Sequence, residues 1–165
     1  MSNQPLNVLF LCTHNSARSI LAEALLNELG AGRFVAYSAG STPRASGTPN
    51  PLALRVLADE GIDTTGLRSK SWDAFLGADA PPIDLVITVC GNANEACPVF
   101  PGRPATAHWG YDDPSAGEAP DEVKLLAFRS TLHQLRRRLL AFVSLPGAAL
   151  QRMALEQSAR HLAGT

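Results

Sequence analysis

The sequence has little net charge and no long apolar run, and each shortage excludes a class of protein. The formal net charge is -1, so nothing supports a nucleic-acid-binding surface or a patch that binds anionic membranes. The N-terminal stretch MSNQPLNVLFLC holds an apolar run of five residues with no basic segment before it. We therefore expect no signal peptide, no membrane span and a cytoplasmic location.

Cysteine is also scarce, with Cys12, Cys90 and Cys97 as the three examples. An odd number in a cytoplasmic chain argues against a secreted scaffold held by disulfides. No Cys-x2-Cys or His-x3-His pattern occurs, and the spacing of Cys90, Cys97 and His108 is irregular for zinc, so we expect no firmly bound metal. The cysteines are therefore either buried small apolar residues or reactive thiols, and their context decides between the two.

The chain alternates strand and helix patterns over one domain, with hydrophobic residues at 45% and 165 residues in all. We expect an α/β domain over residues 1–145 and a C-terminal helical extension over 146–165. Strands are predicted at 8–11, 34–38 and 84–89 and near His108-Trp109, and helices at 19–29, 51–60, 71–76 and 123–143. This alternation predicts right-handed crossovers and a parallel sheet with helices on both faces.

Two of the cysteines follow predicted strands. Cys12 comes just after the first strand and Cys90 just after the third. In parallel α/β sheets the carboxyl ends of the strands form the ligand-binding edge. We therefore expect both residues at the same edge, although 78 positions separate them.

The segment CTHNSAR, from Cys12 to Arg18, leads from a strand into a helix N-terminus. Unpaired backbone amides and the helix dipole favour an anion there, and Arg18 adds a planar set of donors suited to oxyanions. The same environment favours the thiolate form of Cys12 and makes it a candidate nucleophile. Ser19 can donate a hydrogen bond to that thiolate, and Asn15 can hold the loop in shape.

The stretch VLFLCTHNSARS, with HWGYDDP downstream, resembles the arsenate reductases built on the low-molecular-weight protein tyrosine phosphatase fold. The similarity spans roughly residues 7 to 143 and implies a four-stranded parallel sheet flanked by helices on both faces. It implies that Cys12 is the nucleophile, that Arg18 binds the oxyanion, and that Asp113, before Pro114, handles protons. The segment DDP alone would be interpreted as a turn. The resemblance assigns the oxyanion cradle to Thr13, His14, Asn15, Ser16, Ala17, Arg18 and Ser19.

The later cysteines distinguish a reductase from a phosphatase. Phosphatases of this fold carry aromatic residues after the Asp-Pro pair, whereas Ser-Ala-Gly follows here. Cys90 and Cys97 flank a short polar linker that fits a thiol relay, in which a Cys12–Cys90 disulfide is followed by a Cys90–Cys97 disulfide. Arsenate is then the substrate, with phosphate or sulfate as competing oxyanions. Thioredoxin is the expected external reductant, and glutaredoxin with a low-molecular-weight thiol is the alternative.

Three further expectations stay open. Thioredoxin-coupled relatives bind potassium beside the loop; Asn15, Glu23 and Ser38 match that site, and the remaining ligands are expected within residues 69–73. No tightly bound cofactor is expected. The alternative functions are a phosphatase acting on phosphotyrosine or small phosphoesters, and a non-catalytic module that binds anions or senses redox state through a thiol.

Overall fold

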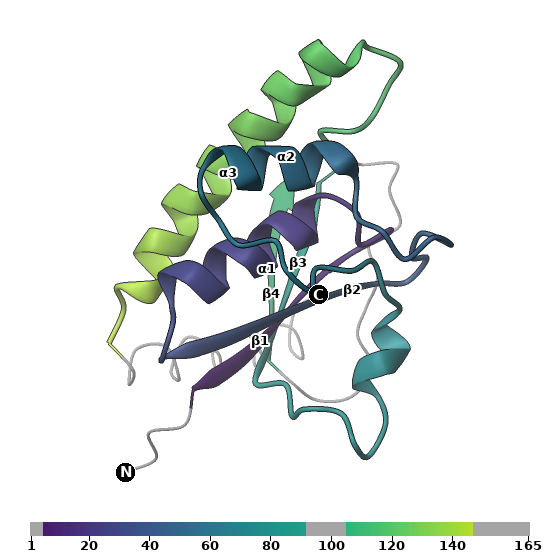
Figure 1. The fold of residues 1–165 in the computed structure, drawn as a ribbon. Helices are drawn as coiled ribbons and strands as arrows, with labels where there is room; N and C mark the ends of the chain where they lie inside the picture. Colours follow the sequence, from purple (N-terminus) through teal and green to yellow (C-terminus); the bar gives the residue numbers. More distant parts are fainter. Residues whose placement is uncertain (1–4, 92–104, 147–165) are drawn as a thin grey trace.

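Four strands form one parallel sheet in a computed structural model that describes residues 5–91 and 105–146 (Figure 1). The sheet order is β2-β1-β3-β4, and each neighbouring pair is parallel. The strands are β1 (Leu6–Cys12), β2 (Phe34–Gly40), β3 (Leu85–Cys90) and β4 (Ala105–Tyr111). The predicted four-stranded parallel sheet is confirmed. The fourth strand is longer than the sequence pattern near His108 indicated.

The helices lie close to their predicted ranges. They are α1 (Arg18–Leu29), α2 (Pro51–Asp59), the 3-10 helix η1 (Trp72–Phe75) and α3 (Asp121–Val143). At the start of α2, the Asn50 side chain accepts a hydrogen bond from the Leu52 amide at 2.9 Å, and Pro51 fills the first helical position. Within the two described ranges, no helix has the length and apolar character needed to cross a membrane.

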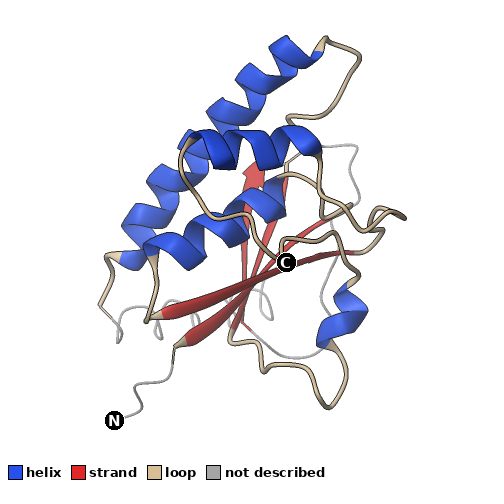
Figure 2. Cartoon of the chain, viewed as in Figure 1, coloured by secondary structure: helices blue, strands red, loops and turns tan. Residues whose placement is uncertain are grey.

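The two faces of the sheet are covered unequally. Strand residues alternate between them, so Val8 and Phe10 of β1 face the core beneath α1, α2 and α3, whereas Leu9 and Leu11 face the opposite side. The described α-helices α1, α2 and α3 gather on one face and pack against one another (Figure 2). On the other face, within the described part of the chain, Trp72 and Phe75 of η1 pack against the smaller core.

The chain changes face beside the end of β2. After α2 it runs to Ser71, which forms a parallel bridge with Gly40, the last residue of β2. It then forms η1 on the second face and enters β3. This route brings residues 68–71 against the carboxyl edge of the sheet, where the predicted loop also lies.

The sequence predicts Cys12 and Cys90 just after their strands. The structure instead places each as the last residue of its strand, and the two strands are neighbours. Both side chains are buried, at 2% and 3% exposure, so each extends the apolar run of its strand. The carboxyl edge therefore ends in Gly40, Cys12, Cys90 and Tyr111, one from each strand.

A helical extension is predicted over residues 146–165. Its residues after 146 lie outside the described part of the chain, so the extension and the boundary at residue 145 stay predictions.

Candidate functional site

The loop after Cys12 joins the end of β1 directly to the beginning of α1. Helix α1 begins at Arg18, its N-cap residue Ala17 supplies no side-chain hydrogen bond, and its first turn carries no acidic residue. The first amides of a helix have no partner within the helix and carry a partial positive charge. The N-terminus of α1 is therefore a favourable place for an anion.

Donors from three distant segments hold the loop in place, and each of them uses a loop carbonyl as its acceptor. The bonds are Thr42 N to Thr13 O at 2.8 Å, Ser69 Oγ to His14 O at 2.8 Å and Asn50 N to Ser16 O at 2.9 Å. The shape of the loop thus depends on residues up to 55 positions away in the sequence. The resemblance implies potassium ligands within residues 69–73 near the loop, but it does not predict that Ser69 donates to a loop carbonyl, because no local pattern links the two.

The loop packs tightly against the bare end of β2. Asn15 is fully buried and has a left-handed φ of 49°. A Cβ atom on Gly40 would lie 2.6 Å from the Thr13 carbonyl oxygen and 2.9 Å from the Asn15 amide nitrogen. Glycine is therefore required at the end of β2 so that the loop can approach, a constraint that the sequence alone did not reveal.

A chain of hydrogen bonds runs from Lys70 through Asn15 and Ser19 to Cys12. The Lys70 amide donates to Asn15 Oδ1 at 2.9 Å, and Asn15 Nδ2 donates to Ser19 Oγ at 2.8 Å. Ser19 Oγ lies 2.8 Å from Cys12 Sγ. The Ser19 hydroxyl has one hydrogen to donate, and a thiolate sulfur can only accept, so Ser19 is the donor whenever Cys12 is ionised. Such a donor would stabilise negative charge on Cys12.

Arg18 connects the loop to the far strand. It is 3% exposed, and its Nη1 donates to the Tyr111 carbonyl oxygen at 2.9 Å. Tyr111 pairs with Cys90 in the register of β3 and β4. The guanidinium group is therefore fixed at the same edge as the second cysteine.

The structure places two of the three predicted redox cysteines at this edge. Cys12 and Cys90 end adjacent strands, and both side chains are buried there. The register pairs Leu11 with Thr88, so Cys12 lies one residue and Cys90 two residues beyond a directly paired position. Cys97 lies outside the described residues.

Asp113 is held in a local turn just beyond β4. Its Oδ1 accepts from the Ser115 amide at 2.9 Å and from Ser115 Oγ at 2.7 Å. Asp113 is half-buried, whereas the neighbouring Asp112 is exposed. The carboxylate is two residues from Tyr111, whose carbonyl binds Arg18, so the turn lies beside the loop.

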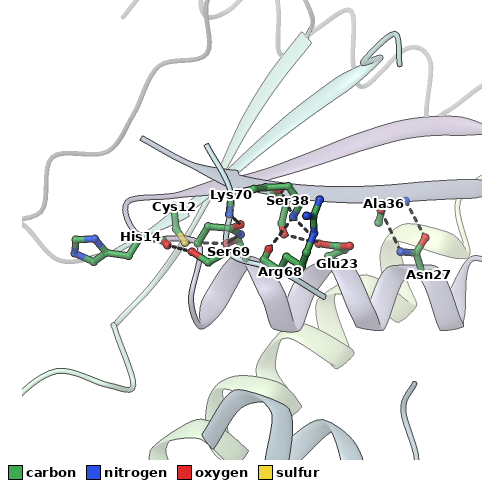
Figure 3. A network of polar contacts seen from close by, with 11 residues as sticks. Cys12, His14, Glu23, Asn27, Ala36, Ser38, Arg68, Ser69 and Lys70 are labelled. Atoms are coloured by element: carbon green, nitrogen blue, oxygen red, sulfur yellow. Dashed lines mark hydrogen bonds and ion pairs between the residues drawn. The ribbon is translucent and has the colours of Figure 1, made fainter. Parts of the chain in front are cut away.

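His14 extends away from the other labelled residues in Figure 3, and its side chain is exposed. Its Nδ1 lies 3.0 Å from the Thr42 carbonyl oxygen. A carbonyl can only accept, so this nitrogen carries the hydrogen. The side chain of His14 therefore anchors the outer side of the loop.

Within the described ranges, no group of three or more His, Cys, Asp and Glu side chains is placed to hold a metal ion.

The residues matched to a potassium site surround a lysine (Figure 3). Ser38 Oγ donates to Glu23 Oε1. The Lys70 ammonium lies 3.9 Å from the same carboxylate oxygen and donates to the Ser38 carbonyl at 3.0 Å. A further cation beside this ammonium would meet a like charge, so the residues do not fit potassium in addition to Lys70.

Burial sets the titration of this pair. Desolvation raises the pKa of Glu23, although the Lys70 charge and the Ser38 hydroxyl oppose that rise. Desolvation also lowers the pKa of Lys70, although the Glu23 charge opposes that fall. Each group therefore makes the charged form of the other less costly.

Comparison with known proteins matches the chain to a phosphatase family model and to proteins named arsenate reductases. The family model for low molecular weight phosphotyrosine protein phosphatase matches residues 7–155. A curated arsenate reductase from Halalkalibacterium halodurans is 37% identical over 82% of this chain and 93% of its own length. The crystal structure of an arsenate reductase from Archaeoglobus fulgidus aligns with a TM-score of 0.66 and 29% identity over 84% of this chain and 99% of that one. A thioredoxin-dependent arsenate reductase from Corynebacterium glutamicum aligns with a TM-score of 0.54 and 26% identity over 86% of this chain and 65% of that one.

Proposed function

The chain belongs to the low molecular weight phosphotyrosine protein phosphatase family, and we propose that it reduces arsenate to arsenite through a relay of cysteine thiols. The observation that carries this proposal is the position of Cys90, which ends the strand next to the one that Cys12 ends. Reduction of arsenate by this route needs a second thiol, whereas hydrolysis of a phosphoester does not. The names of the similar proteins favour the same reaction.

The loop supports binding of a tetrahedral oxyanion. Its carbonyls accept from donors outside the loop, so we expect its amides to face the bound anion. Arg18 and the N-terminus of α1 add positive charge at the same place. Arsenate, phosphate and sulfate share this geometry, so phosphate and sulfate should compete with arsenate.

In the first step the Cys12 thiolate attacks arsenic. A sulfur–arsenic bond forms while the bond from arsenic to a hydroxyl group of arsenate breaks, and this leaving hydroxyl takes a proton from Asp113 and departs as water. Arsenic remains in the +5 state. The Ser19 hydroxyl, 2.8 Å from Cys12 Sγ, supports the thiolate before the attack.

In the second step the Cys90 thiolate attacks the sulfur of Cys12. A disulfide forms, the sulfur–arsenic bond breaks, and its electron pair stays on arsenic, which is thereby reduced to the +3 state and leaves as arsenite. Adjacent parallel strands lie about 4.8 Å apart. Strand ends at that spacing suit the separation of up to about 7 Å between alpha carbons that a disulfide tolerates.

In the third step the Cys97 thiolate attacks the sulfur of Cys90, which frees Cys12 and leaves a Cys90–Cys97 disulfide. A dithiol protein then reduces that disulfide. Cys97 lies outside the described residues, so this step depends on the sequence. The thioredoxin-dependent relative favours thioredoxin as the reductant, and glutaredoxin with a low-molecular-weight thiol is the alternative.

A coupled steady-state assay tests the reaction. Arsenate, thioredoxin, thioredoxin reductase and NADPH should together support NADPH consumption that depends on this protein. The same assay with glutaredoxin and glutathione or mycothiol identifies the physiological class of reductant. Consumption at the background rate with every reductant would contradict the proposal.

Hydrolysis of phosphate esters is the second candidate, because the family model describes a phosphatase and the loop suits phosphate equally well. The substitution Cys90→Ser separates the two. It should stop multiple turnover with arsenate and spare any hydrolysis of p-nitrophenyl phosphate, whereas Cys12→Ser should abolish both. An equal loss of both activities in Cys90→Ser would argue against the relay.

A further inference from the structure

We propose that the ammonium group of Lys70 is a built-in cation that supports the loop from Cys12 to Arg18, called the oxyanion loop below, and that it takes the place of a diffusible monovalent cation. The inference is independent of the substrate, because it concerns how the loop is held. Its test therefore uses readouts that do not need arsenate turnover.

The surroundings of Lys70 Nζ are those of a cation site. The group donates to the carbonyl oxygens of Ser38 at 3.0 Å and Arg68 at 2.8 Å, and it lies 3.9 Å from Glu23 Oε1. Backbone carbonyls and a carboxylate are the hard oxygen ligands that alkali and alkaline-earth cations take in proteins. The side chains of Lys70 and Glu23 are 22% and 15% exposed, so the charge is largely removed from water.

The oxygen atoms come from three separate parts of the fold. Glu23 lies on α1, Ser38 lies on β2, and Arg68 lies in the segment that leads to η1 (Figure 3). The positive charge thus joins the helix that begins at the loop to the strand against which the loop packs. Without it, the Glu23 carboxylate would remain in this largely buried place with the Ser38 hydroxyl as a hydrogen-bond donor but with no compensating charge from Lys70.

The backbone of Lys70 transmits this support to the nucleophile. Its carbonyl accepts from the Gly40 amide at 2.9 Å, and its amide donates to Asn15 Oδ1 at 2.9 Å. Asn15 in turn orients the Ser19 hydroxyl, which contacts Cys12 Sγ. Lys70 is therefore a positioning residue that acts on Cys12 through Asn15 and Ser19.

The test compares the wild-type protein with Lys70→Met, Lys70→Arg and the control Lys124→Met, which removes the same charge from α3. Each protein is measured in potassium chloride and in choline chloride, both at about 100 mM so that screening is equal. The readouts are the melting temperature and the rate at which iodoacetamide modifies Cys12, followed by mass spectrometry of the Cys12 peptide.

We expect the wild-type protein and Lys124→Met to give the same values in both salts. In choline, Lys70→Met should melt about 5 °C lower and its Cys12 should react about threefold more slowly, because the donor to the thiolate is less firmly oriented. Potassium should restore part of both losses in Lys70→Met, and Lys70→Arg should keep the positive charge and lose less.

Three results would overturn the inference. The first is a wild-type protein that potassium stabilises as much as it stabilises Lys70→Met. The second is a Lys70→Met protein that matches the wild type in both salts. The third is a loss in Lys70→Met that neither potassium nor the arginine variant reduces, since the place would then need lysine for a reason other than its charge. If Lys70→Met does not fold, Lys70→Gln replaces it with the same expected results.

Discussion

The oxyanion loop and the turn that carries Asp113 lie at the same edge of the sheet, but different parts of the chain hold them. The loop depends on donors from residues 42, 50 and 69 and on close packing against Gly40. The turn is held by Ser115, two residues from the carboxylate that it orients. The loop with the proposed nucleophile is thus positioned by contacts from across the fold, whereas the proposed proton donor, Asp113, is positioned by its own short segment.

Because of this difference, the loop and the turn should respond unequally to substitutions elsewhere in the chain. A substitution at a distant residue should disturb the loop, because several long-range contacts together hold Asn15 in its left-handed conformation. The turn should tolerate changes elsewhere, because an Asp side chain that accepts from a backbone amide two residues later is a self-contained motif. The predictions below test this contrast in order of decreasing effect.

The largest effect is expected for Arg18→Lys, which alters the loop itself. Lysine keeps the charge but loses the planar set of donors and the bond to the Tyr111 carbonyl. We expect kcat/KM for arsenate to fall about 100-fold, with little change in the melting temperature. The control Arg55→Lys, on the exposed side of α2, should stay within about twofold of the wild type. Equal kinetics for Arg18→Lys and the wild type would show that Arg18 does not bind the oxyanion.

A smaller but clear effect is expected for Gly40→Ala, which reaches the loop only through packing. The new Cβ atom would lie 2.6 Å from the Thr13 carbonyl oxygen, so the loop must move. We expect about a tenfold loss of kcat/KM and about 1–3 kcal/mol in the free energy of unfolding from urea titration. Gly77→Ala is the matched control, because no atom lies within 4 Å of the Cβ that it adds. Similar behaviour of the two variants would remove the case for a tightly packed loop.

The turn should respond weakly to Ser115→Ala. This change removes the hydroxyl donor at 2.7 Å and keeps the amide donor at 2.9 Å, so Asp113 retains its local support. We expect kcat/KM for arsenate to fall about threefold. In the control Ser130→Ala, on α3, kcat/KM should stay unchanged. A loss as large as that of Gly40→Ala would mean that the turn is not the more independent of the two regions.

The smallest effect concerns the titration of Glu23, which belongs to the long-range support of the loop. Burial raises its pKa above the ordinary value of 4.5, so its contribution to stability is fully present below that pH and is lost as pH rises through the raised pKa. Glu23→Gln does not titrate. The stability advantage of the wild type over Glu23→Gln, measured by urea unfolding, should therefore shrink as pH rises from about 4.5 to about 8. An advantage that grows over this range, or the same trend in the exposed control Glu118→Gln, would contradict the assignment.

The contrast also explains what could be predicted from the sequence. The strand, the cysteine, the arginine and the helix of the loop are local in sequence, so their arrangement could be predicted from residues 8–29. The turn at Asp113 follows from its own residues in the same way. The resemblance places residues 69–73 beside the loop, but the contacts that Gly40, Ser69 and Lys70 make with it could not be predicted from residue patterns. These residues meet the loop only after α2 has packed and the chain has passed the end of β2.

The potassium hypothesis shows the same limit. Glu23 and Ser38 lie together, as the resemblance implied, but the positive charge beside them belongs to Lys70 of the chain itself. A set of acidic and hydroxyl residues predicts that a cation is needed. The spacing of Glu23 and Ser38 in the sequence does not show which cation supplies the charge, because Lys70 belongs to a different segment of the chain.

Single turnover of Cys97→Ser with arsenate tests the central claim most directly, because it stops the relay after its second step. Without an external reductant, each protein molecule should release about one arsenite and retain a Cys12–Cys90 disulfide, identified by mass spectrometry of peptides made without reduction. Release of arsenite with Cys90 still a free thiol would contradict the account, because arsenic would then have taken its electrons from elsewhere.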